Sequence, residues 1–169
     1  MKLVYGPDPT TSDLFTTYCD ADHGGNRDNR KSTGGYIVKL GVGAVCWSSK
    51  LQPVVSLSTT EAEYVAAVAA GKEICWMRNL LQELGYTSSQ PSPLWIDNQS
   101  CITVAKNPEH HGRMKHLDLC FYWLRDMVEK KVIAPAHLPT EEMPADLLTK
   151  PLAKPKVEKF RGIMGLIKI

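Results

Sequence analysis

The stretch TTEAEYVAAV, residues 59–68, opens a long helix and carries two glutamates with different surroundings. Ser58 and Glu61 have the spacing of a capping box, in which each side chain accepts a hydrogen bond from an otherwise unpaired backbone N–H. Glu63 instead lies on an apolar stripe that continues to Leu81 and is spaced to pack against a sheet. Because a lone carboxylate is costly to bury, the presence of Glu63 on this face indicates a role other than forming the helix.

The segments around this helix alternate between strand-like and helix-like patterns, which predicts an α/β domain. Before it, β-branched and aromatic residues separated by glycine-containing turns predict an antiparallel meander of strands at 14–20, 34–40 and 44–50. The helix is expected to end near Leu84, with Gly85 as its C-cap. After it, the pattern predicts a strand at 93–97, helices at 97–106 and 114–131, an edge strand at 132–139, a short helix at 144–150 and a final amphipathic piece.

Length and composition predict one domain with distinct ends. The chain has 169 residues, of which 43% are hydrophobic, and this is enough for a single core. We expect a linker at residues 1–13, the folded domain at 14–150 and a basic amphipathic segment at 151–169. From Lys150 onward the local charge is +5, which leaves −3 for the preceding residues. This distribution favours either a polyanionic partner or a solvated basic helix.

Cysteine usage and hydropathy predict an intracellular protein. The five cysteines are scattered among apolar residues and form no C-x-x-C pair, as expected of reduced thiols. The first residues show no signal-peptide pattern, and no apolar run approaches the roughly 18 residues that a membrane span needs. We therefore expect a soluble chain with no membrane contact.

Four acidic residues fall at predicted element boundaries or on a core face, namely Asp20, Glu63, Asp97 and Asp146. Taken singly, three of them have structural explanations: a turn residue for Asp20, a helix N-cap for Asp97 and a favourable helix-dipole position for Asp146. Taken together, carboxylates that converge without basic partners repel one another unless cations lie among them. Oxygen ligands of this kind suit Mg²⁺ or Mn²⁺, and two such ions can hydrolyse a phosphodiester.

Six motifs carry a family resemblance when they are taken in order and spacing. They are YCDAD, KSTGGYIVKLG, WSSKLQPVVSLSTTEAEYVA, WIDNQSCITVAKNP, KHLDL and PTEEMPADLLTKPL, and the resemblance that they carry covers about residues 14–166. Together they resemble the ribonuclease H domain at the C-terminal end of copia-type retrotransposon polyproteins. The resemblance implies a ribonuclease H-like fold, with a mixed five-stranded sheet of antiparallel and parallel strands flanked by helices.

The resemblance also implies an activity and a set of site residues. Members of this family cut the RNA strand of an RNA–DNA hybrid with Mg²⁺, for which Mn²⁺ can substitute. The catalytic, metal-binding acids of the family match Asp20, Glu63, Asp97 and Asp146, and substrate-binding positions match Ala21, Asp22, Lys115 and His116. The implied partners are the hybrid and the reverse transcriptase domain of the parent polyprotein. The implied location is the cytoplasm, in virus-like particles if the element is active.

Two departures from the wider fold concern substrate handling. Cellular members carry a mobile histidine shortly before the last aspartate, where this chain has Thr140 or Glu141, and His137 is expected to lie in a strand. Cellular members also often carry a basic helical protrusion, for which the loop at 107–113 is too short. Affinity for the hybrid is then expected from the basic C-terminal segment or from the polymerase domain.

Two alternative interpretations remain open at this point. A structural zinc site is suggested by the clustering of Cys101, His110, His111, His116 and Cys120, although their spacing matches no standard zinc finger. The second alternative keeps the fold but drops the enzyme, leaving a nucleic-acid-binding module or a stranded transposon fragment. Retention of all four acids speaks against long decay of such a fragment.

Overall fold

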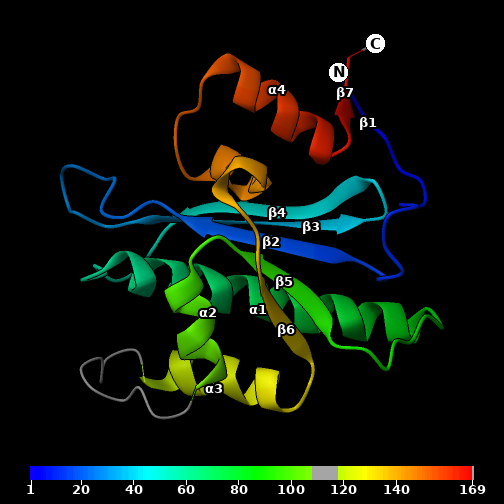
Figure 1. The fold of residues 1–169 in the computed structure, drawn as a ribbon, viewed down its shortest axis with the longest axis horizontal. Helices are drawn as coiled ribbons and strands as arrows, with labels where there is room; N and C mark the ends of the chain where they lie inside the picture. The colour runs from blue at the N-terminus through cyan, green and yellow to red at the C-terminus, as the bar shows by residue number, and fades with distance from the viewer. Residues whose placement is uncertain (108–117, 169) are drawn as a thin grey trace.

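A five-stranded sheet runs through the centre of the computed structural model, which describes residues 1–107 and 118–168 (Figure 1). The strand order is β4-β3-β2-β5-β6. Strands β2, β3 and β4 pair antiparallel, and β5 and β6 continue the sheet in parallel. The bounds are β2 Thr16–Ala21, β3 Thr33–Leu40, β4 Gly43–Leu51, β5 Ser92–Ile96 and β6 Ile133–His137. This confirms the predicted mixed sheet, with the proline-containing strand β6 at its edge.

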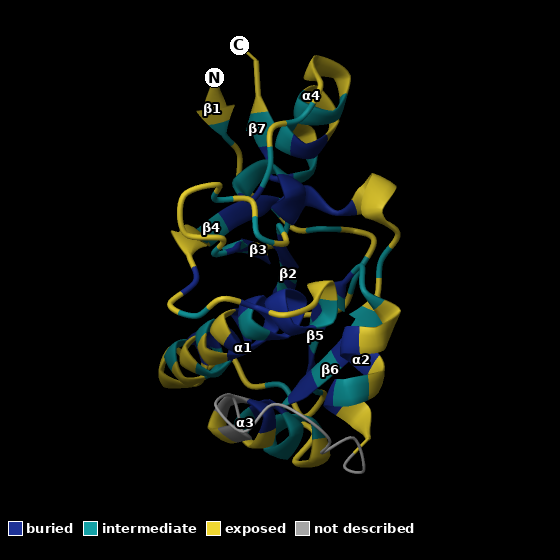
Figure 2. Cartoon of the chain, turned by 90° about the vertical axis from the view of Figure 1, so that its left-hand side faces the viewer, coloured by how far each residue is buried: buried dark blue, intermediate teal, exposed yellow. Residues whose placement is uncertain are grey.

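Helices cover both faces of the sheet (Figure 1). On one face lie α1 (Thr59–Glu83), α2 (Gln99–Lys106) and α3 (Asp118–Glu129). On the other face lie the 3₁₀ turns η2 (Thr140–Glu142) and η3 (Pro144–Leu148), followed by α4 (Lys154–Ile163). Figure 2 shows that the buried residues gather along the sheet and on the helix sides that face it.

The start and end of α1 follow the sequence pattern. The Ser58 side chain accepts a hydrogen bond from the Glu61 N–H at 3.1 Å, and Glu61 Oε2 accepts one from the Leu57 N–H at 2.6 Å. Gly85 has a φ of +87°, the left-handed conformation that a glycine adopts most easily after a helix. The predicted Ser58 cap and the C-terminal glycine are therefore confirmed, and Glu61 closes the helix start through the Leu57 N–H, one residue before the cap. Glu63 plays no part in either.

The two ends of the chain lie side by side. Strand β1 (Lys2–Leu3) pairs antiparallel with β7 (Leu166–Ile167), so the segment predicted as a linker contains a strand. In the C-terminal segment, Phe160 and Met164 are buried, and Met164 packs with Ile37 of the sheet. The division into segments 1–13, 14–150 and 151–169 stays a prediction. Among the helices of the described residues, none combines the length and the apolar character needed to cross a bilayer.

Gly35 allows η3 to approach the sheet closely. A Cβ at this position would lie 2.8 Å from Leu148 Cβ and 3.0 Å from Thr149 Cγ2. We expect Gly35→Ala to lower the free energy of unfolding by about 1–3 kcal/mol because this contact cannot relax without moving the turn. Urea denaturation measures the change, with Gly162→Ala as control, since nothing lies within 4 Å of the corresponding Cβ in α4. Equal stability of the two variants would contradict the expectation.

Candidate metal centre

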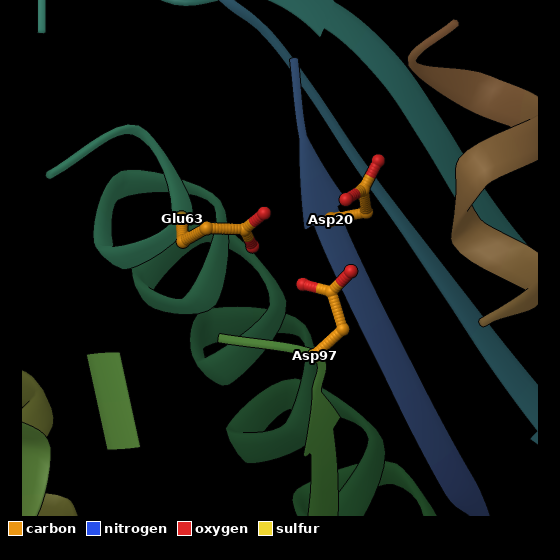
Figure 3. Close-up of side chains that lie close together, drawn as sticks. All are labelled: Asp20, Glu63 and Asp97. Atoms are coloured by element: carbon orange, nitrogen blue, oxygen red, sulfur yellow. The ribbon is translucent and has the colours of Figure 1, made fainter. Parts of the chain in front are cut away.

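Three carboxylates meet where two parallel strands end (Figure 3). Asp20 lies near the end of β2, Asp97 follows β5 directly, and Glu63 projects toward them from the first part of α1. One oxygen of each lies within 4.8 Å of the oxygens of the other two. Strands β2 and β5 are parallel neighbours, so their C-terminal ends lie at the same edge of the sheet. The chain topology thus brings together three of the four acids that the sequence singled out.

Glu63 is buried, poorly hydrogen-bonded and has a raised pKa. Its side chain is buried, Oε1 accepts a weak hydrogen bond from the Ala21 N–H at 3.4 Å, and Oε2 has no hydrogen-bond partner among the described residues. Burial, together with the charges of Asp20 and Asp97, raises the pKa of Glu63 from 4.5 to about 9. Without a cation, this carboxyl therefore holds its proton at neutral pH.

The donor set of this cluster fits a hard divalent cation. All three side chains offer carboxylate oxygens, which Mg²⁺ and Mn²⁺ prefer over nitrogen or sulfur. The unpartnered buried Glu63 Oε2 is the kind of atom that a bound cation would satisfy. Asp20, Glu63 and Asp97 are therefore the residues that could hold such an ion.

Asp97 is not the N-cap of α2, which corrects the structural explanation considered for it from the sequence. The cap is Asn98, whose Oδ1 accepts a hydrogen bond from the Cys101 N–H at 2.9 Å. Asp97 instead accepts a hydrogen bond on Oδ2 from the Thr140 hydroxyl of η2 at 2.9 Å. The helix does not need Asp97, so this carboxylate is available to the cluster.

Asp146 lies in η3 and is paired with two lysines. Its Oδ1 is 2.9 Å from Lys150 Nζ, and its Oδ2 is 3.0 Å from Lys156 Nζ. Asp146 is fully buried but is not part of the three-acid group. The assumption that the acids lack basic partners is therefore wrong for Asp146, and it is also wrong for Asp20, which lies 3.4 Å from Lys150 Nζ.

Asp20 links the three-acid group to Asp146. It accepts a hydrogen bond from the Thr149 hydroxyl, and its Oδ2 lies 3.4 Å from Lys150 Nζ. Burial raises the pKa of Asp20, although the Thr149 hydrogen bond and the Lys150 charge oppose this. Sequence reasoning missed Lys150, yet its position one turn after Asp146 in ADLLTK was a signal that it could reach the same carboxylate.

The other predicted residues are placed as follows. Ala21 is buried with its N–H directed at Glu63, and Asp22 Oδ1 accepts a hydrogen bond from the Thr33 N–H. His137 lies in β6, as expected. Lys115, His116 and two further histidines of the proposed zinc group, His110 and His111, lie outside the described residues. The remaining zinc candidates are Cys101, which is buried in the core, and Cys120.

Comparison with curated proteins finds relatives among transposon polyproteins. The chain is 42% identical over 161 residues to the retrovirus-related Pol polyprotein from transposon TNT 1-94 of Nicotiana tabacum. It is 40% identical over 152 residues to that from transposon RE2 of Arabidopsis thaliana. These matches cover 95% and 90% of the chain but span only 12% and 10% of the two polyproteins. No family model matches the chain.

Comparison with solved structures finds the same fold in nucleases and polymerases. LC11-RNase H1 in complex with an RNA/DNA hybrid aligns with a TM-score of 0.55 and 17% identity, over 80% of this chain and 93% of that one. Prototype foamy virus protease-reverse transcriptase aligns with a TM-score of 0.50 and 12% identity, over 92% of this chain and 21% of that one. At these identities the likeness shows a shared fold.

Proposed function

Because this chain is an RNase H-like domain whose homologues are the Pol polyproteins of copia-type retrotransposons, we propose that it hydrolyses the RNA strand of RNA–DNA hybrids. The observation that carries the proposal is the convergence of Asp20, Glu63 and Asp97, together with the unpartnered Oε2 of Glu63. An apo protein would gain nothing from keeping three buried or half-buried acids so close together. A bound cation explains why they are retained.

In this proposal the acids are ligands for Mg²⁺, with Mn²⁺ as a substitute. Asp20, Glu63 and Asp97 would hold one ion, and Asp20 and Asp146 lie on the side where a second would be held. Such ions, when bound, lower the pKa of an attacking water and stabilise the departing ribose 3′-oxygen.

Neighbouring residues orient these ligands. The Thr149 hydroxyl holds one oxygen of Asp20, and the Thr140 hydroxyl holds one oxygen of Asp97. Each hydrogen bond occupies one oxygen of its carboxylate, so the second oxygen is left for other partners. Partners of this kind fix the orientation of metal ligands, and their loss typically costs 10–100-fold in metal affinity or activity. Thr140 or Glu141 stands where cellular members have a histidine, and the hydrogen bond from Thr140 to Asp97 supports a positioning role for Thr140 in this proposal.

The proposed substrate is recognised by shape and by 2′-hydroxyl contacts, because RNA-containing duplexes are read mostly in that way. The backbone at Ala21 and Asp22 borders the carboxylates and is proposed to lie against the hybrid, together with Lys115 and His116. LC11-RNase H1 was solved with an RNA/DNA hybrid, which supports this substrate class. The reverse transcriptase domain of a Pol polyprotein is the proposed partner.

The test is cleavage of a labelled hybrid by the purified chain, with single-stranded RNA and duplex DNA as control substrates. We expect the RNA strand of the hybrid to be cut in the presence of Mg²⁺ and to stay intact in EDTA. Cleavage of all three substrates would contradict the proposed specificity. Binding of the hybrid without cleavage would instead support a nucleic-acid-binding module, to which the basic residues of α4 would contribute.

A further inference from the structure

We propose that Lys150 is a resident cation of the Asp20–Asp146 side of the centre, and that it suppresses binding of a divalent ion on that side. The inference rests on the proposed function in one respect, namely that the carboxylates bind divalent ions. Its consequence is that the two sides of the centre fill unequally, with the Asp20–Glu63–Asp97 side first.

The ammonium group of Lys150 bridges two buried carboxylates. Its Nζ lies 3.4 Å from Asp20 Oδ2 and 2.9 Å from Asp146 Oδ1, and both aspartate side chains are only 1% exposed. A cation in this position neutralises charge that burial would otherwise make costly. The lysine therefore performs, for this pair, the electrostatic role that a metal ion would perform.

The side chain of Lys150 can move away from the two aspartates. Its side chain is 34% exposed, so the ammonium can move into solvent without crossing the core. It follows Thr149, whose hydroxyl holds Asp20 independently, so Asp20 keeps a partner when the lysine withdraws. The position between the two aspartates can thus exchange one cation for another.

The two sides of the centre differ in their counter-charges. No described ion pair involves Glu63 or Asp97, whereas Asp146 already has both Lys150 and Lys156. On the first side an incoming divalent ion meets a lysine only at Asp20 and replaces the proton of Glu63, whereas on the second side it must displace Lys150 from between both aspartates. Two like-charged groups within about 4 Å repel strongly enough, even at an effective dielectric constant of about 20, to lower affinity by tenfold or more.

Lys156 provides a matched control. It carries the same charge and binds the same aspartate, with Nζ 3.0 Å from Asp146 Oδ2. Its other described ion pair is with Glu141, at 4.0 Å, which is not one of the four acids of the centre. No described ion pair joins it to Asp20. A pure charge effect would make the two lysines equivalent, whereas a bridging role distinguishes Lys150.

The experiment is a Mn²⁺ titration followed by electron paramagnetic resonance, with the parent chain, Lys150→Met and Lys156→Met in the absence of nucleic acid. We expect the parent to bind one Mn²⁺ well before a second. In Lys150→Met the second ion should bind roughly tenfold more tightly and give the spectrum of a spin-coupled pair. In Lys156→Met the second affinity should change by less than about threefold.

Three results would overturn the inference, and they separate it from the proposed function. Unchanged binding in Lys150→Met, or equal gains in both variants, would refute the role of Lys150 and leave the metal centre intact. Absence of Mn²⁺ binding to every protein would refute the metal centre and this inference with it. Lys150→Gln serves the same comparison if the methionine variant does not fold, and Lys150→Arg should restore parental binding because it keeps the charge.

Discussion

Replacement of Asp97 by asparagine should lower Mg²⁺-dependent cleavage of the hybrid by at least about 100-fold, because even partners outside the ligand shell are worth 10–100-fold. The change removes a negative ligand but keeps an oxygen that can accept the hydrogen bond from Thr140. It also removes repulsion with Asp20 and Glu63. We therefore expect the metal-free variant to be at least as stable as the parent in thermal melts.

The neighbouring residue supplies the control for this prediction. Asn98 caps α2, so Asn98→Ala should cost about 1 kcal/mol in stability while leaving cleavage close to the parental rate under folding conditions. Asp97→Asn is thus expected to lose cleavage and keep stability, whereas Asn98→Ala is expected to lose stability and keep cleavage. A metal-free Asp97→Asn variant that loses as much stability as Asn98→Ala would show that Asp97 supports the fold and not the metal centre.

The second large effect is a fall in the stability of the metal-free protein as pH rises from about 5 to about 9. In the folded state the pKa of Glu63 is raised from 4.5 to about 9, chiefly by burial and then by Asp20 and Asp97. Between these values the folded state binds a proton that the unfolded state has lost. Stability therefore decreases with pH across this window: the stabilising contribution of this proton is complete below the lower value and is lost as pH rises through the upper one.

Thermal melts in EDTA at a series of pH values measure this dependence. Glu63→Gln should flatten most of the slope, because the amide is neutral at every pH. Glu83→Gln, an exposed position near the end of the same helix, should keep the parental slope. Saturating Mg²⁺ should also reduce the slope, since a bound cation favours the ionised carboxylate. An unchanged slope in Glu63→Gln would refute the raised pKa.

Much of the fold was predictable because its signals are local. The capping box at Ser58 and Glu61, the apolar stripe of α1 and the strand patterns before it depend on residues that are close in sequence. Glu63 was identified as exceptional for the same reason, since the helix already had its cap. The proximity of Asp20, Glu63 and Asp97 then follows from strands that end at one edge of the sheet.

The errors concern boundaries and distant partners. Asp97 and Asn98 are both good helix caps, so sequence patterns cannot decide which of two adjacent residues begins α2. The bridge from Lys150 to Asp20 joins residues 130 positions apart, and no local pattern reports it. The pairing of β1 with β7 involves two residues in each strand, which is too short for hydrophobic periodicity to appear.

The most direct test of the central claim is a side-by-side assay of the parent chain and Asp97→Asn, with the RNA strand of the hybrid end-labelled. The account predicts that the parent shortens the RNA in Mg²⁺, while the variant binds the hybrid equally well and leaves the RNA at full length. This comparison matters because a contaminating host nuclease would cut in both preparations. Equal cleavage by the two proteins would contradict the assignment of hydrolysis to this carboxylate centre.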